Sequence, residues 1–82
     1  MSETEILDQI IVIIRKSFSD PALAITKDTT AADVRGWNSL AHVRLMLGIE
    51  RAFNLRFSAA AVANLNSVGD ICTLVEAGKR HV

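Results

Sequence analysis

The sequence contains few of the residues that build aromatic cores, disulfides or metal sites. Among 82 residues there is no tyrosine, and aromatic residues make up 5% while apolar residues make up 50%. This balance disfavours an aromatic-rich β-sandwich and favours an aliphatic, helical core. The one cysteine, Cys72, excludes an internal disulfide, and with only two histidines it cannot complete an ordinary structural zinc site. We therefore expect a cytoplasmic protein without a bound metal.

Net charge and long apolar runs are lacking as well. Nine Lys and Arg residues balance nine Asp and Glu residues, so the positive field on which sequence-independent nucleic-acid binding depends is missing. The longest apolar run, Ile10–Ile14, falls far short of the roughly 20 residues that a membrane span needs. The acidic start of the chain lacks the features of a signal peptide. We expect one small domain over residues 1–82 that neither crosses a membrane nor binds nucleic acid.

Apolar residues recur with the period of a helix in three segments, residues 3–18, 39–53 and 67–78. In the first segment, acidic residues at the start and basic residues at the end suit the helix dipole, which favours a helix although its β-branched centre would also suit a strand. Ser67-Val68-Gly69-Asp70 has the form of a capping box, and Gly78 is expected to end the last helix. A short helix is expected over residues 58–63. The sequence thus predicts an all-α fold, a small four-helix bundle of three longer helices and one short helix with a long first loop.

The connection between the first two predicted helices, residues 19–38, is about 20 residues long, which is unusual for so small a domain. Such a loop is often functional, although here it can equally be a spacer between antiparallel helices. Four side chains are candidates to pin it to the core: Ala24, Ile25, Val34 and Trp37. The second helix is expected to carry a broad apolar face formed by Leu40, Val43, Met46, Leu47, Ile49 and Phe53.

The stretch Gly36-Trp37-Asn38-Ser39-Leu40 places a serine at the first turn of the second helix. The first N–H groups of a helix lack internal partners and carry partial positive charge, so a phosphate ester on Ser39 would be favoured there. Ser39 or Asn38 can also be a simple N-cap, which is the commoner reason for a serine at this position. Spacing alone therefore favours the cap.

A hydrolase is the first rival interpretation, because His42 follows Ser39 by three residues and Asp33 precedes both. The sequence has no Gly-x-Ser-x-Gly elbow and no predicted strand to deliver the serine, so we reject a Ser-His-Asp triad and assign no catalytic residue. His42 is expected at the surface or at a rim. Cys72 is expected to be a buried, unreactive thiol on the apolar side of the last helix.

The segment from Gly36 to Val43 resembles the acyl carrier protein family, including peptidyl and polyketide carriers, whose motif is Asp-Ser-Leu. The resemblance continues through Leu55-Arg56-Phe57-Ser58 and through residues 64–70. It implies that Ser39 carries a 4′-phosphopantetheine group, transferred from coenzyme A, whose thiol holds acyl groups as thioesters. It also implies a carrier and not an enzyme. The partners would be a phosphopantetheinyl transferase and acyl-loading, elongating or acyl-transfer enzymes. We expect the protein itself to be a monomer.

The sequence departs from the family pattern in its charges. Asn38 stands where the family has aspartate, and three positions of the second helix where acids are expected hold Ala41, Arg44 and Arg51. These departures favour a specialised fatty-acid, lipid or polyketide pathway over housekeeping fatty-acid synthesis. The expected partner-binding residues are Trp37, Asn38, Leu40, Arg44, Leu47 and Arg51.

Two questions stay open at this stage. The neutral Asn38 also suits an unmodified, carrier-like helical docking module, and a DNA-binding three-helix domain is a distant third possibility because the basic residues are balanced by acids. Gly48 costs its helix about 1 kcal/mol relative to alanine. It either admits the close approach of a partner or an acyl chain, or is simply tolerated.

Overall fold

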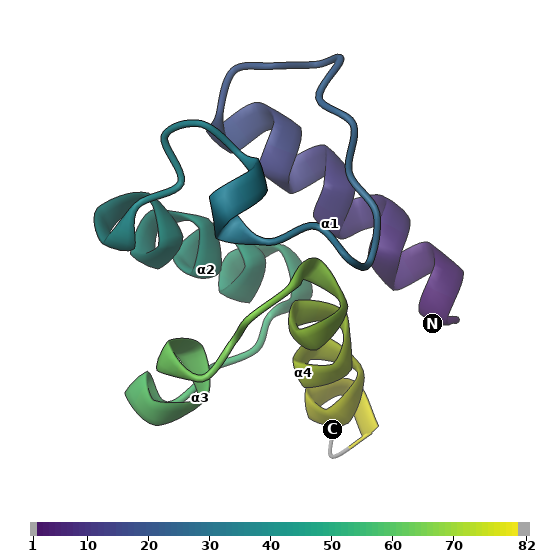
Figure 1. Cartoon of the computed structure of the whole chain (residues 1–82). Helices are drawn as coiled ribbons and strands as arrows, with labels where there is room; N and C mark the ends of the chain where they lie inside the picture. Colours follow the sequence, from purple (N-terminus) through teal and green to yellow (C-terminus); the bar gives the residue numbers. More distant parts are fainter. Residues whose placement is uncertain (1, 81–82) are drawn as a thin grey trace.

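The computed structural model describes residues 2–80, which form four α-helices and one short 3₁₀ turn (Figure 1). The helices are α1 (Glu3–Ser17), α2 (Ser39–Phe53), α3 (Ala59–Ala63) and α4 (Val68–Arg80), and the 3₁₀ turn η1 is Ala31–Asp33. No strand occurs within this part of the chain. Figure 1 shows α1 in the upper right, α2 to the left, α4 running downward below α1, and α3 set apart at the lower left, below α2. The predicted all-α class with three longer helices and one short helix is confirmed.

Side-chain caps set the starts of the helices. At α1 the Ser2 hydroxyl accepts a hydrogen bond from the backbone N–H of Glu5 at 3.2 Å, and the Glu5 carboxylate accepts one from the Ser2 hydroxyl at 3.1 Å. At α4 the Asp70 N–H donates to the Ser67 hydroxyl at 3.3 Å, while the Asp70 carboxylate accepts from the Ser67 N–H at 3.2 Å. These pairs satisfy backbone donors that a helix leaves without partners. The capping box predicted at Ser67 is therefore present.

The core lies where the inward faces of α1, α2 and α4 meet. Its members on these helices are aliphatic apart from one phenylalanine and one methionine, and each is at most 3% exposed: Ile6, Ile10, Ile14, Leu45, Met46, Ile49, Phe53, Val68, Ile71 and Val75. Burial of such a side chain is worth about 1.5–3 kcal/mol. The low aromatic content of the chain is thus offset by closely packed aliphatic residues.

The predicted apolar face of α2 is buried only in part. Leu40, Val43 and Leu47 are 61%, 50% and 48% exposed, whereas Leu45, which was not in the predicted face, is fully buried. Both sets follow a helical period, since α2 is apolar on more than one side. Packing against α1 selects one side for the core and leaves the other on the surface.

The long loop is held to the core by side chains. Ile25, Val34 and Trp37 are buried, as predicted. Ala24 is exposed, and the neighbouring Leu23 packs against the core instead. The prediction for Ala24 was wrong because alternate residues of an extended segment point to opposite sides, and the larger side chain takes the inward one.

Backbone bonds also hold the loop to the start of α4. The N–H of Val68 donates to the Thr29 carbonyl and the N–H of Gly69 donates to the Lys27 carbonyl, both at 2.8 Å. These N–H groups belong to the first turn of α4 and have no partner within the helix. The loop is therefore a cap of α4 as well as a connection.

Two glycines lie inside helices. α4 continues through Gly78 to Arg80, so the prediction that this glycine ends the helix was wrong. A Cβ at Gly78 would lie 2.9 Å from Cδ1 of Leu55, so the close packing of this side chain accounts for the glycine. At Gly48 a Cβ would meet Cγ2 of Ile13 at an ordinary 3.8 Å. Gly48 thus lies against α1.

Candidate functional site

Ser39 is the first residue of α2, and its side chain is exposed. The N-cap is Asn38, whose Oδ1 accepts a hydrogen bond from the backbone N–H of Ala41 at 2.9 Å. Of the two candidate caps, Ser39 and Asn38, it is therefore the side-chain amide of Asn38 that caps α2. The Ser39 hydroxyl is consequently not needed to cap the helix.

The loop reaches Ser39 through a turn that Trp37 anchors. Gly36 has a φ of 88°, in the left-handed region that glycine adopts without strain. Trp37 then enters the core, where its ring lies 5.6 Å from the ring of Phe18 between centroids. Anchoring of Trp37 fixes the position of the two residues that follow it.

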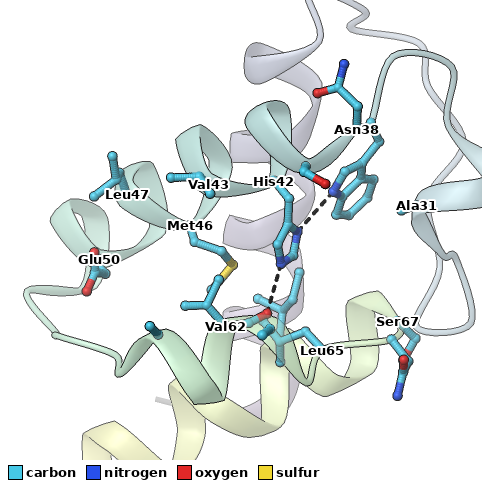
Figure 2. A pocket seen from close by; sticks show the side chains of 16 residues that line it. Ala31, Asn38, His42, Val43, Met46, Leu47, Glu50, Val62, Leu65 and Ser67 are labelled. Carbon is cyan, nitrogen blue, oxygen red and sulfur yellow. Dashed lines mark hydrogen bonds between the residues drawn. The ribbon is translucent and has the colours of Figure 1, made fainter.

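His42 connects this loop to α3. The indole Nε1–H of Trp37 donates to Nδ1 of His42 at 3.1 Å, and Nε2 of His42 lies 3.1 Å from the carbonyl oxygen of Val62 (Figure 2). An indole nitrogen can only donate, so Nδ1 accepts and the ring proton is on Nε2, which donates to Val62. His42 is half-buried and engaged at both nitrogens, so it is more than the rim residue expected from the sequence.

This arrangement provides no catalytic triad. Both nitrogens of His42 are occupied by Trp37 and Val62, so neither is free to take a proton from Ser39. The Asp33 carboxylate accepts hydrogen bonds from the N–H and the hydroxyl of Thr30, at 2.9 and 3.1 Å. The rejection of a Ser-His-Asp hydrolase is therefore consistent with the geometry.

A pocket of about 740 Å³ lies between α2 and α3, and both Ser39 and Asn38 are among its lining residues. In Figure 2, Asn38 is at one end of the pocket and Glu50 at the other, with Met46 and Val62 between them. The lining is predominantly apolar on both helices, with larger side chains on α2 and mainly alanines on α3. Pockets of this size accommodate small organic molecules.

The exposed side of α2 is apolar and basic. Leu40, Val43 and Leu47 are exposed there, and Arg44 and Arg51 are exposed on the same helix. The single acid of α2, Glu50, is half-buried and accepts a hydrogen bond from the N–H of Phe57 at 2.8 Å. We call the five exposed residues the α2 face.

A smaller hollow of about 260 Å³ lies at the Ser39 end of the α2 face, between the end of α1 and the start of α2. Phe18, Gly36, Leu40 and Arg44 are among its lining residues. Of the expected partner-binding residues, Asn38 lines this hollow as well, whereas Trp37 is buried and supports the surface from behind. Val43 belongs to the same surface, although the sequence analysis did not place it among the partner-binding residues.

Cys72 is half-buried on α4. Burial raises the pKa of its thiol, and the charge of Lys27 opposes this effect in part. The thiol therefore stays protonated near neutral pH and is a poor nucleophile, as expected. Among residues 2–80, no cluster of three or more histidine, cysteine or acidic side chains is placed to bind a metal, and no helix has the length and apolar character to cross a membrane.

Comparisons with known proteins find acyl carrier proteins. The chain is 33% identical over 73 residues to the acyl carrier protein of Guillardia theta, covering 85% of this chain and 90% of the relative. It is 29% identical over 79 residues to that of Prochlorococcus marinus (strain MIT 9515), covering 96% and 99%. The solved structure of holo acyl carrier protein from Geobacter metallireducens superposes with a TM-score of 0.84 at 31% identity, covering 92% of this chain and 86% of the other. No protein-family model matches the chain.

Proposed function

The chain belongs to the acyl carrier protein family, whose members are carriers and not enzymes, and from this membership we propose that Ser39 is the attachment site of 4′-phosphopantetheine. The Ser39 hydroxyl would attack the diphosphate of coenzyme A. Its oxygen would form the new phosphoester bond, its proton would be lost, and adenosine 3′,5′-bisphosphate would leave. The attached group supplies a thiol that holds acyl groups as thioesters.

The observation that carries this proposal is the division of roles between Asn38 and Ser39. Asn38 caps α2, so Ser39 is exposed at the helix start without a structural task. A phosphodiester at this position would lie beside the first N–H groups of α2, where an anion is stabilised. The first turn of α2 contains no acidic residue that would repel it.

The pocket beside Ser39 supports a carrier of aliphatic acyl chains. It lies between α2 and α3, it is lined mainly by aliphatic side chains, and Ser39 is at its edge. A tethered chain would enter it at a high effective concentration, because the tether removes most of the cost of bringing the two together. The site would thus shelter the chain between visits to separate enzymes.

The experiment that tests the attachment is a mass measurement on apo protein incubated with coenzyme A and a broad-specificity phosphopantetheinyl transferase. We expect one phosphopantetheine increment, mapped to Ser39 by peptide fragmentation. The variant Asn38→Asp runs in parallel, because aspartate keeps the cap and restores a charge that a basic transferase surface can engage. We expect a higher rate for this variant.

The pattern of the two results separates the alternatives. An increment on both proteins supports a carrier open to a generic transferase. An increment on Asn38→Asp alone supports a carrier that needs a dedicated transferase. No increment on either protein contradicts the proposal and favours the unmodified docking module, for which the neutral Asn38 is the specific observation.

We further propose that the α2 face docks the enzymes that load, elongate or transfer the acyl group. Its exposed apolar side chains lie next to Ser39, and its charges are those of Arg44 and Arg51. The one ion pair among residues 2–80 is Arg80–Glu76 on α4, so both arginines are free to meet a partner. Such a surface fits enzymes with acidic docking sites, which would belong to a specialised fatty-acid, lipid or polyketide pathway.

Charge reversal on the α2 face is expected to improve transfer to enzymes with basic docking sites. With acyl-loaded protein and a housekeeping ketosynthase, Arg44→Glu and Arg51→Glu should each raise kcat/KM, on the order of tenfold, by replacing repulsion with attraction. Lys27→Glu is the matched control, because Lys27 is exposed on the loop beside α4. An efficient wild type, or an equal gain from Lys27→Glu, would contradict the proposed charge selection.

A further inference from the structure

The attachment of α3 to the rest of the molecule depends on few contacts. α3 has five residues and buries none of them fully. One polar tie reaches it from α2, namely the bond from Nε2 of His42 to the Val62 carbonyl, at 3.1 Å. A second tie, from the Phe57 N–H to the Glu50 carboxylate, holds the connection that precedes α3. His42 is therefore placed to control the separation between α2 and α3.

We propose that Trp37, His42 and Val62 form a latch that sets the opening of the pocket beside Ser39. Through one nitrogen His42 holds α3, and through the other it holds the loop that leads into Ser39 (Figure 2). All three residues line the pocket. The inference rests on the proposed function only in one respect, namely that the molecule passing through the opening is an acyl chain.

The latch requires one protonation state of His42. Nδ1 must be unprotonated to accept from the Trp37 indole, and Nε2 must carry the proton to donate to Val62. A proton on Nδ1 would place two donors against each other and break the bond to Trp37. The bond to Val62 would remain, and the charge on the ring would strengthen it. Acid therefore releases the loop side of the latch and keeps the α3 side.

The pocket around His42 has few other ionisable side chains. Among residues 2–80, the ionisable side chains that line the pocket are those of His42 and Glu50. Glu50 lies eight residues further along α2, about 12 Å along the helix axis, and already accepts from the Phe57 N–H. α3, η1 and α4 present no ionisable side chain to the pocket.

Amide side chains can separate the two halves of the latch. Glutamine at position 42 can place a donor where Nε2 lies, and asparagine can place an acceptor where Nδ1 lies. His42→Gln should therefore keep the tie to Val62 and release Trp37, whereas His42→Asn should do the reverse. Trp37→Phe removes the indole donor, so the protection of the α3 amides should be the same in this variant as in His42→Gln.

The test is hydrogen exchange and nitrogen NMR on the apo protein, which needs no modification of Ser39. In the wild type near pH 8 we expect a protonated Nε2 and an unprotonated Nδ1 on His42. When the pH is lowered from about 8 to about 5, a proton added to Nδ1 would displace the indole donor, so protection of the Trp37 indole N–H should fall about tenfold while that of the α3 amides is kept. Protection is expressed relative to an unstructured peptide, so that the intrinsic pH dependence cancels.

The variants give the second readout. His42→Asn should lower the protection of the α3 amides about tenfold and leave that of the Trp37 indole N–H unchanged. His42→Gln should lower the protection of the indole N–H alone. Amides of α1 report whether a variant keeps its fold; if one does not, the wild-type pH series decides. The proposed latch would be overturned by a proton on Nδ1 at pH 8. It would also be overturned if the protection of the indole N–H and that of the α3 amides changed in parallel. The mass measurement on Ser39 is independent of every one of these results.

Discussion

Replacing Ser39 by alanine is expected to abolish attachment of phosphopantetheine while leaving the stability of the protein nearly unchanged. The substitution removes the hydroxyl that would form the phosphoester bond. It leaves the cap of α2 in place, because Asn38 makes that hydrogen bond. Ser39 is exposed, and alanine is the best helix former, so the free energy of unfolding should change by less than about 0.5 kcal/mol. Intact mass after incubation with coenzyme A and transferase, together with a thermal melt, measures both effects.

Asn38→Ala is the matched control for the Ser39 substitution. It removes the cap and should lower the free energy of unfolding by about 1 kcal/mol, but it keeps the hydroxyl and should still gain the increment. A Ser39→Ala protein that still gained the phosphopantetheine mass would place the attachment on another side chain. A large loss of stability in Ser39→Ala would show that the hydroxyl has a structural role.

The second large effect is expected in the core, where Ile49→Ala should destabilise the protein by about 2–5 kcal/mol. Ile49 is fully buried within the core that α1, α2 and α4 share. Removal of its side chain loses apolar burial and leaves a cavity that the surrounding helices fill only in part. For a chain of this length, such a loss is a large part of the total stability. Urea unfolding followed by circular dichroism measures it.

Leu47→Ala provides the comparison on the same helix. Leu47 is 48% exposed, so its truncation should cost less than about 1 kcal/mol. Because Leu47 belongs to the α2 face, the variant should instead transfer its acyl group less efficiently to a partner enzyme. Equal destabilisation by both substitutions would contradict the assignment of the inward and outward sides of α2.

The bounds of the helices could be predicted closely because strong local signals mark them. The predicted limits of α2, residues 39–53, are those of the structure. A cap residue before its first turn and Asn54 in the left-handed conformation after its last turn define the two ends. At α4 the start was marked by Ser67 and Asp70, whereas the end was not, because a glycine packed against Leu55 looks the same in sequence as one that ends a helix.

The orientation of α2 and the role of His42 depend on tertiary contacts that periodicity does not encode. Leu45 and Leu47 are equally apolar, and only the position of α1 decides which is buried. The partner of Nε2 is the backbone carbonyl of Val62, twenty residues away, and a carbonyl has no signature in sequence. The five-residue spacing to Trp37 was visible, but it has no meaning until the loop is folded. The location of Ser39 was predictable, and the identity of the cap was not.

The bonds between the long loop and α4 bear on the order in which the protein can fold. Thr29 and Lys27 accept from Val68 and Gly69, so these contacts join parts of the chain that are far apart in sequence. Contacts of this kind carry a high loop-closure entropy and form after local helices. The loop that leads into Ser39 therefore acquires its full set of partners only when the last helix has been made and has docked. A transferase that reads the geometry of this loop would thereby distinguish a finished fold from a nascent chain.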